Sequence, residues 1–170
     1  NLSAVPFAAV HDQLESTFNH VAKNRKLGFE VAFAKDLQPV IITDEMRLLQ
    51  VMKNLLSNAF KFTEKGKVSV RVDRATSGWS TDNENLNKAN EVFAFTVEDT
   101  GIGISADKQR IIFEAFQQGD GRTARKYGGT GLGLSISREI ARLLGGELAL
   151  VRSTPQQGST FVLYVPQNSI

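Results

Sequence analysis

The stretch "NLLSNAFKFT", residues 54–63, combines an apolar stripe with a polar one. The apolar residues lie at helical spacing, and they are Leu55, Leu56, Ala59 and Phe60. The polar residues Asn54, Asn58 and Lys61 follow one another at intervals of four and three. On a helix that turns about 100° per residue, these three side chains fall within about 60° of one another. The stretch therefore predicts a helix that packs on a core with one face and presents two amides and an ammonium group beside it.

Composition and charge favour a single globular domain and argue against several other classes of protein. The 170 residues are 41% hydrophobic and 22% charged, which is typical of one soluble globular domain spanning residues 1–170. The chain has no cysteine, so it offers neither a disulfide framework nor a thiolate metal site. It also lacks an apolar run near the roughly 20 residues that span a bilayer, which argues against direct membrane contact. A net charge of +2 with scattered basic residues argues against nucleic-acid binding.

Hydrophobic spacing predicts the regular elements. Helices are expected at residues 6–27, from the candidate N-cap Asp44 to about Phe62, at 105–116, and at 132–146 with Gly145 at the end. Strands are expected at 29–34, 40–43, 67–72, 92–97, 147–151 and 159–165. This order lacks strict βαβ alternation and therefore favours an α+β fold. We expect a two-layer sandwich, with a mixed, mostly antiparallel sheet of about five strands covered on one face by three main helices.

One segment shows no hydrophobic period. Residues 75–91 are rich in Ser, Asn, Thr and Asp and join two predicted strands, which predicts a long, mobile hairpin loop. Trp79 within it is a candidate contact with another domain.

Two glycine-rich stretches raise the question of phosphate binding. "DTGIGI" (99–104) and "GGTGLGL" (128–134) carry glycines at alternate positions, which lets a ligand approach the backbone amides closely. The second stretch leads directly into a predicted helix, whose free N–H groups and dipole favour an anion. A pair of tight turns would explain the same glycines, so either stretch alone leaves both interpretations open.

Other nucleotide and hydrolase motifs fit these stretches poorly. Residues 101–106 match the dinucleotide fingerprint, but no buried strand ending in an acidic residue follows about 20 residues later. "GGTGLGLS" has no lysine where a P-loop requires one. Ser135 lacks the flanking glycines of a nucleophile elbow.

The polar stripe suits a magnesium nucleotide better. Mg²⁺ takes one or two oxygen ligands from a protein and completes its shell with water and phosphate oxygens, so the Asn58 carbonyl is a suitable ligand. Lys61, one turn away, provides a point charge for phosphate. Asp99, at the end of an apolar strand, is expected to be buried and to accept a hydrogen bond from the exocyclic amine of adenine.

The order of these stretches resembles a known family. The matching segments are residues 44–63, "EDTGIGI" (98–104), "FEAF" (113–116), "YGGTGLGLSI" (127–136) and "GSTFVLYVP" (158–166). The first four resemble the N, G1, F and G2 boxes of the ATP-binding catalytic domain of sensor histidine kinases, and the fifth resembles a strand that lines the base pocket of that domain. The domain belongs to the GHKL superfamily with its Bergerat-type sandwich. The resemblance covers essentially the whole chain.

The resemblance implies a role for each matching position. Asn58 would bind Mg²⁺, Asn54 would be a second amide on the phosphate or metal side, and Lys61 would contact phosphate. Phe62 would lie by the adenine or ribose, and Asp99 would read the adenine. The remaining positions that the resemblance assigns to the nucleotide are Gly101, Gly103 and Ile104 in the G1 box, Gly129, Thr130, Gly131, Leu132 and Gly133 in the G2 box, and Thr160 in the base pocket.

The same resemblance places a mobile ATP lid at residues 114–130. Arg125 and Lys126 within it would contact phosphate after closure, although a solvated charged face would explain them equally well. Tyr127 would either cover the nucleotide or anchor the lid to the domain.

The resemblance also implies the reaction and its partners. Hydrolysing relatives carry a Glu at the position of Asn54, and an amide cannot act as a general base. A kinase that transfers the γ-phosphoryl group of ATP is therefore favoured over a GHKL ATPase, with a nucleotide-sensing module as a third possibility. The acceptor His would stand in a separate dimerisation domain, because His11 does not match its motif, and a response-regulator receiver domain would be the next partner. The resemblance also implies a cytoplasmic location. The sequence around the G2 box resembles that of bacterial hybrid kinases.

Overall fold

The computed structural model describes residues 1–100, 129–154 and 158–168 of the chain. Its elements, in chain order, are β1 (Ser3–Pro6), α1 (Phe7–Arg25), β2 (Gly28–Phe33), β3 (Val40–Thr43), α2 (Glu45–Phe62), β4 (Lys67–Ala75), α3 (Glu84–Lys88), β5 (Val92–Asp99), α6 (Gly129–Leu143), β6 (Glu147–Thr154) and β7 (Gly158–Pro166). No helix in these ranges combines the length and the apolar content needed to cross a membrane.

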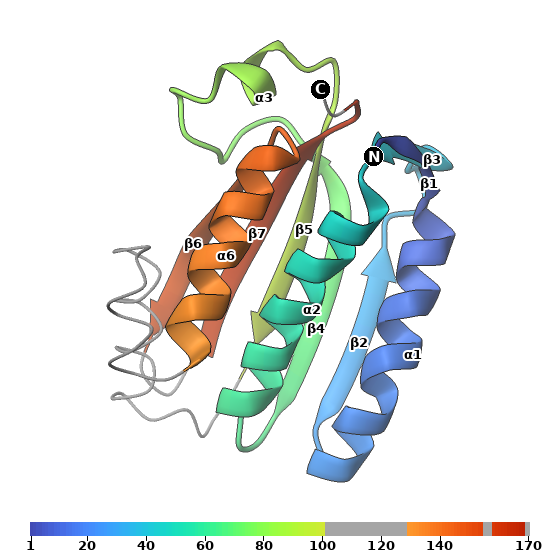
Figure 1. Cartoon of the computed structure of the whole chain (residues 1–170). Coiled ribbons are helices and arrows are strands. Elements are labelled where there is room, and N and C mark those ends of the chain that lie inside the picture. Colours follow the sequence, from blue (N-terminus) through green and yellow to red (C-terminus); the bar gives the residue numbers. More distant parts are fainter. Residues whose placement is uncertain (101–128, 155–157, 169–170) are drawn as a thin grey trace.

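Within the described residues, the main sheet has five strands in the order β2-β4-β5-β7-β6. Among these five strands β2 and β4 pair in parallel, and the other neighbours pair antiparallel. Helices α1, α2 and α6 lie side by side over one face of this sheet (Figure 1). The predicted α+β sandwich is therefore confirmed.

The strand predicted at residues 40–43 is correct, but its partner was missed. This strand, β3, pairs antiparallel with β1 and forms a separate two-stranded sheet. β1 contains four residues and ends at Pro6, so it is too short to show an alternating pattern.

Helix α2 forms where the sequence predicts it. The carboxylate of Asp44 accepts a hydrogen bond from the backbone N–H of Arg47 at 3.1 Å, which is the N-cap geometry. Its apolar stripe is buried against the sheet and the neighbouring helices, and this stripe comprises Leu48, Val51, Met52, Leu55, Leu56, Ala59, Phe60 and Phe62. The same packing holds the polar stripe in place beside the core.

The connection between β4 and β5 differs from the irregular loop that was expected. It contains α3, which is capped by the side chain of Asn83 accepting from the N–H of Leu86 at 3.1 Å. Leu86 is 1% exposed and belongs to a small apolar cluster with Val92, Ala94, Val162 and Tyr164. A five-residue helix is too short to show a hydrophobic period, so sequence spacing could not reveal it.

Trp79 lies within this connection and packs inside the chain. Its ring contacts Tyr164 edge-on at 5.6 Å, and its Nε1–H donates to Asn87 at 2.8 Å. The carboxylate of Glu147 accepts from the backbone N–H of Ser80 at 2.9 Å. Burial raises the pKa of Tyr164, and the charge of Glu147 raises it further. These contacts explain Trp79 without a second domain.

Candidate functional site

Four elements meet at one end of the sheet. The C-terminal end of α2, the first turn of α6, the end of β5 and the start of β7 lie together at the lower end of the view in Figure 1. A small pocket between α2 and the sheet has a polar lining from Asn58, Asp99 and Ser159. Its apolar lining consists of Leu55, Ala59, Phe62, Val97 and Phe161. The fold thus brings three predicted site residues, Asn58, Phe62 and Asp99, into one pocket.

Asp99 is held at the end of β5 by the neighbouring strand β7. It is 5% exposed, and its Oδ1 accepts a hydrogen bond from the backbone N–H of Ser159 at 3.3 Å. A hydrogen bond from an N–H to one carboxylate oxygen fixes the orientation of the group. Such a carboxylate suits a ligand that donates an N–H to it.

Gly158 makes room for this carboxylate. It has a φ of +99°, and a Cβ added there would lie 2.0 Å from the carbonyl oxygen of Asp99 and 2.7 Å from its Oδ1. Only glycine allows this approach of β7 to β5, so Gly158 belongs to the site. The sequence signal for it is the glycine that opens "GST" at residues 158–160.

Substituting Gly158 by alanine (Gly158→Ala) should displace Asp99. We expect ATP affinity to fall by about tenfold or more, since the carboxylate would lose its bond to Ser159. We also expect a lower melting temperature, because alanine is strained at a positive φ. Titration calorimetry and thermal unfolding measure the two effects.

Gly145→Ala is the matched control for this substitution. Gly145 also has a positive φ, of +79°, but among the described residues a Cβ there would meet only Pro166, at 3.5 Å. It should lower the melting temperature and leave ATP affinity unchanged. Equal affinities of Gly158→Ala and the wild type would contradict the role of Gly158.

Thr160, which was expected in the base pocket, lies on the opposite face of the sheet. Its hydroxyl donates to the carboxylate of Glu98 at 3.3 Å and accepts from Arg152 at 3.4 Å. Successive residues of a strand point to opposite faces, so the pocket side chain of β7 is Ser159. The prediction of Thr160 is therefore wrong by one residue, because the sequence did not show which face each residue of "GST" would take.

The polar stripe of α2 divides between two neighbours. Asn58 is half-buried and lines the pocket, whereas Asn54 is half-buried and faces α6, where its Nδ2 donates to Ser137 Oγ at 3.3 Å. Lys61 is exposed, with its ammonium 5.5 Å from the centre of the Phe62 ring. The stripe therefore runs from the α2–α6 contact at Asn54, past the pocket residue Asn58, to the exposed Lys61.

Several predicted site residues lie outside the described part of the chain. These are Gly101, Gly103, Ile104, Arg125, Lys126 and Tyr127, together with most of the lid predicted at residues 114–130. Residues Gly129, Thr130, Gly131, Leu132 and Gly133 are the first five of helix α6. The first four N–H groups of an α-helix have no partner within it. The backbone at this end of α6 can therefore donate to an anion.

The donors gathered here fit a magnesium nucleotide. The amide oxygens of Asn54 and Asn58 are hard, neutral ligands, which Mg²⁺ accepts alongside water and phosphate oxygens. The Asp99 carboxylate lies in the same pocket as Asn58, and apolar side chains surround it. This arrangement places a buried hydrogen-bond acceptor beside a neutral amide in one pocket.

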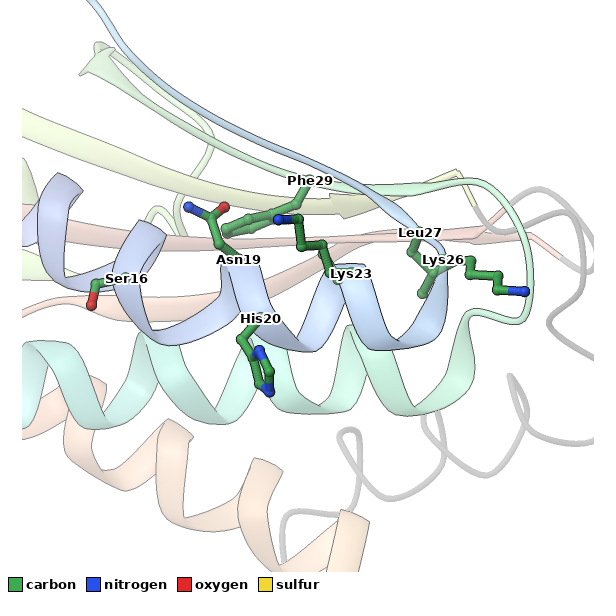
Figure 2. Close-up of a pocket in the computed structure, with 8 residues that line it drawn as sticks. Ser16, Asn19, His20, Lys23, Lys26, Leu27 and Phe29 are labelled. Atoms are coloured by element: carbon green, nitrogen blue, oxygen red, sulfur yellow. The ribbon is translucent and has the colours of Figure 1, made fainter.

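A larger hollow lies elsewhere and has different chemistry. It measures about 690 Å³ and runs along α1 to the start of β2 (Figure 2). Its lining includes His20, Lys23, Lys26 and Phe29, and no carboxylate of the described residues contributes to it. His20 pairs with Asn24 at 3.2 Å. The hollow does not combine an amide with a buried carboxylate, as the pocket does with Asn58 and Asp99.

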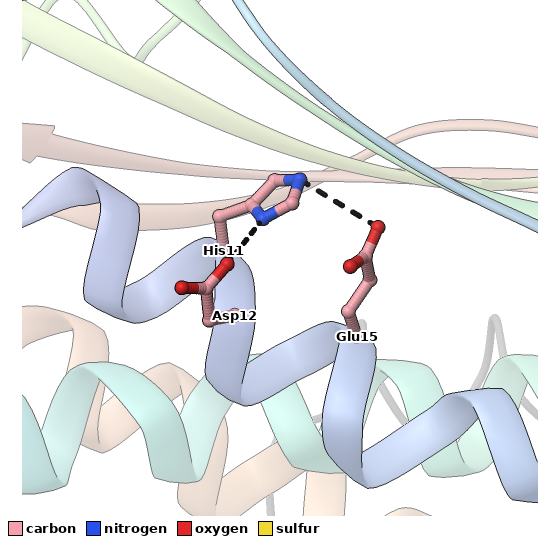
Figure 3. A group of neighbouring side chains, drawn as sticks. All are labelled: His11, Asp12 and Glu15. Carbon is pink, nitrogen blue, oxygen red and sulfur yellow. Dashed lines mark hydrogen bonds and ion pairs between the residues drawn. The ribbon is translucent and has the colours of Figure 1, made fainter.

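The other histidine is part of a small charged cluster on α1 (Figure 3). His11 Nδ1 lies 3.0 Å from Asp12 and its Nε2 lies 3.7 Å from Glu15. The ring also contacts Phe33 edge-on at 5.4 Å. His11 therefore packs at the edge of the first helix, and a carboxylate faces each ring nitrogen.

Comparison with known proteins identifies similar sequences over most of the chain. A family described as histidine kinase-, DNA gyrase B-, and HSP90-like ATPase matches residues 43–169. The circadian input-output histidine kinase CikA of Synechococcus elongatus is 39% identical over 160 residues, which cover 91% of this chain and 19% of that protein. The autoinducer 2 sensor kinase/phosphatase LuxQ of Vibrio vulnificus is 37% identical over 153 residues, covering 90% and 17% respectively. The chain thus spans under a fifth of these relatives.

Solved structures of similar fold were found as well. Full-length ShkA in complex with AMPPNP matches with a TM-score of 0.70 and 29% identity, over 100% of this chain and 32% of that one. A nucleotide-free catalytic domain of the histidine kinase ThkA matches with a TM-score of 0.68 and 19% identity, over 99% and 97% respectively. The second similarity concerns the fold alone.

Proposed function

Because this chain belongs to the family of histidine kinase-, DNA gyrase B- and HSP90-like ATPases, we propose that it binds Mg²⁺-ATP in the pocket between α2 and the sheet. We further propose that it positions the γ-phosphoryl group for transfer to a His of a separate domain, in two-component signalling. The observation that carries this proposal is the pairing of Asn58 with the buried Asp99 in one pocket beside the start of α6. The domain would comprise residues 1–170, with the lid at 114–130.

The base end of the nucleotide would lie against Asp99. Its carboxylate, oriented by the Ser159 N–H, accepts from the exocyclic amine of adenine. Leu55, Phe62 and Phe161 provide apolar contact for the ring. A guanine presents a carbonyl oxygen instead of the amine, so the carboxylate selects ATP over GTP.

The phosphate end would lie between α2 and α6. Asn58 holds the metal through its amide oxygen, Lys61 contacts a phosphate, and the free N–H groups of the first turn of α6 donate to phosphate oxygens. When bound, Mg²⁺ neutralises charge on the phosphates and fixes their orientation. The contribution of the protein is then almost wholly positioning and electrostatics.

Asn54 favours transfer over hydrolysis. It is a neutral amide whose Nδ2 is engaged by Ser137, so it cannot take a proton from water. ATP bound beside it would therefore persist until an acceptor arrives. The acceptor His of a dimerisation domain, followed by a receiver domain, would be the partners.

A phosphoryl-transfer assay tests this function. The full-length protein that carries this chain, incubated with γ-labelled ATP and Mg²⁺, should acquire label on histidine that is stable to base and labile to acid. Asn58→Ala should remove the label. Steady phosphate release that Asn58→Ala abolishes, without labelled histidine, would indicate a GHKL ATPase instead. ATP binding with neither transfer nor release would indicate a nucleotide-sensing module.

A further inference from the structure

One side-chain hydrogen bond joins the two helices that flank the phosphate end of the candidate site. Asn54 Nδ2 on α2 donates to Ser137 Oγ on α6 at 3.3 Å, across 83 residues of sequence. Ser137 is completely buried. A buried hydroxyl group without a hydrogen-bond partner destabilises the folded state. The bond therefore gives the Ser137 hydroxyl a partner and also restrains the Asn54 side chain.

The bond matters because the two ends of an asparagine amide differ chemically. The oxygen accepts and can ligate a cation, whereas the NH₂ group only donates. In the structure Nδ2 makes the bond to Ser137, so Oδ1 is the end left for a metal ion or its water.

We propose that Ser137 is a positioning residue for phosphoryl transfer, because its hydrogen bond holds the Asn54 side chain in place. This inference rests on the proposed function. Ser137 would contribute to transfer through Asn54 and would not itself contact the nucleotide. The same hydrogen bond connects helix α6 to the residue of α2 that we place beside the phosphates. The first turn of α6 carries the backbone N–H groups that we assign to phosphate. Because Ser137 is on the same helix, a movement of α6 would also shift the Asn54 side chain.

A double-mutant cycle tests the proposal. Ser137→Ala should slow phosphoryl transfer by about five- to tenfold, the effect of one lost hydrogen bond. In an Asn54→Ala background the same change should have no further effect, because the side chain that it holds is gone. ADP affinity without Mg²⁺ should stay within about twofold of the wild-type value in every variant.

A readout without nucleotide tests the bond itself. Each single substitution should lower the melting temperature by a few °C, and the double substitution should lower it less than the sum of the two. Ser137→Thr keeps the hydroxyl and should restore transfer relative to Ser137→Ala. Ser135→Ala is the matched control on the same helix, because within the described residues the Ser135 hydroxyl has no hydrogen-bond partner.

The outcomes separate this inference from the proposed function. If the wild type transfers phosphoryl and Ser137→Ala transfers equally fast, the inference is wrong and the function stands. Additive effects of Ser137→Ala and Asn54→Ala, in both rate and melting temperature, would also overturn it. If the wild type binds ATP without transfer, the function fails, and sub-additive melting temperatures would still show that the two side chains are coupled.

Discussion

Asp99→Asn should weaken ATP binding by about 10- to 100-fold. The substitution replaces one carboxylate oxygen with an NH₂ group in a pocket where the carboxylate already accepts from the Ser159 N–H. An NH₂ group turned toward either donor cannot accept, and a buried hydrogen-bonding group left unpaired costs about 1–3 kcal/mol. That free energy corresponds to the expected loss in affinity. Titration calorimetry with ATP measures it directly.

The preference for ATP over GTP should decrease in the same variant. The carboxylate repels the guanine carbonyl oxygen, whereas the NH₂ group of asparagine can donate to it. Competition binding with the two nucleotides gives the ratio. An unchanged ATP affinity would contradict the role of Asp99 in reading adenine.

Glu98→Gln is the matched control for Asp99→Asn. Glu98 is the preceding residue of β5, and its side chain faces the other side of the sheet, where it accepts from Thr160 at 3.3 Å. The substitution makes the same change from carboxylate to amide one residue away. ATP affinity should therefore remain at the wild-type value.

Asn58→Ala should reduce phosphoryl transfer by about 100-fold or more. The substitution removes the amide oxygen that we assign to the metal, and a misplaced metal loses several kcal/mol of charge stabilisation in transfer. Binding of ADP without Mg²⁺ should change by less than about threefold, because the base would still contact Asp99. Transfer rates and ADP affinity, each measured across a range of Mg²⁺ concentrations, distinguish the two effects.

Asn24→Ala provides the comparison for Asn58→Ala. Asn24 is an exposed amide near the end of α1, paired with His20. Its removal should leave both transfer and Mg²⁺ dependence unchanged. If Asn58→Ala needs no more Mg²⁺ than the wild type and transfers at a similar rate, the metal does not depend on Asn58.

Several features of the fold could be predicted from short stretches of sequence. The Asp44 cap, the extent of α2 and the alternating strands depend on residues within one or two turns of each other, so their signals are local. Other elements were not predicted, because the element is too short to show a hydrophobic period or depends on contacts with a distant segment of the chain. β1 is visible only through its pairing with β3, and α3 only through the burial of Leu86 on the second face of the sheet.

The candidate site shows the same division. Asn58, Phe62 and Asp99 were predicted as site residues, and the fold brings them into one pocket. The sequence also indicated a glycine-rich start for α6. Because side chains alternate along a strand, a shift of one residue moves a group to the other face, and this alternation replaces the expected Thr160 with Ser159.

The sequence by itself determined an α+β sandwich, the helix that carries Asn54, Asn58 and Lys61, and the family to which the chain belongs. Those conclusions follow from the hydrophobic periodicity and from the order of the motifs, and both can be seen directly in the sequence. Only the tertiary structure decided that Gly158 presses against Asp99 and that Asn54 meets Ser137. Both contacts join segments about 60 to 80 residues apart. Hydrophobic packing and strand register bring such segments together, and neither leaves a local mark in the sequence.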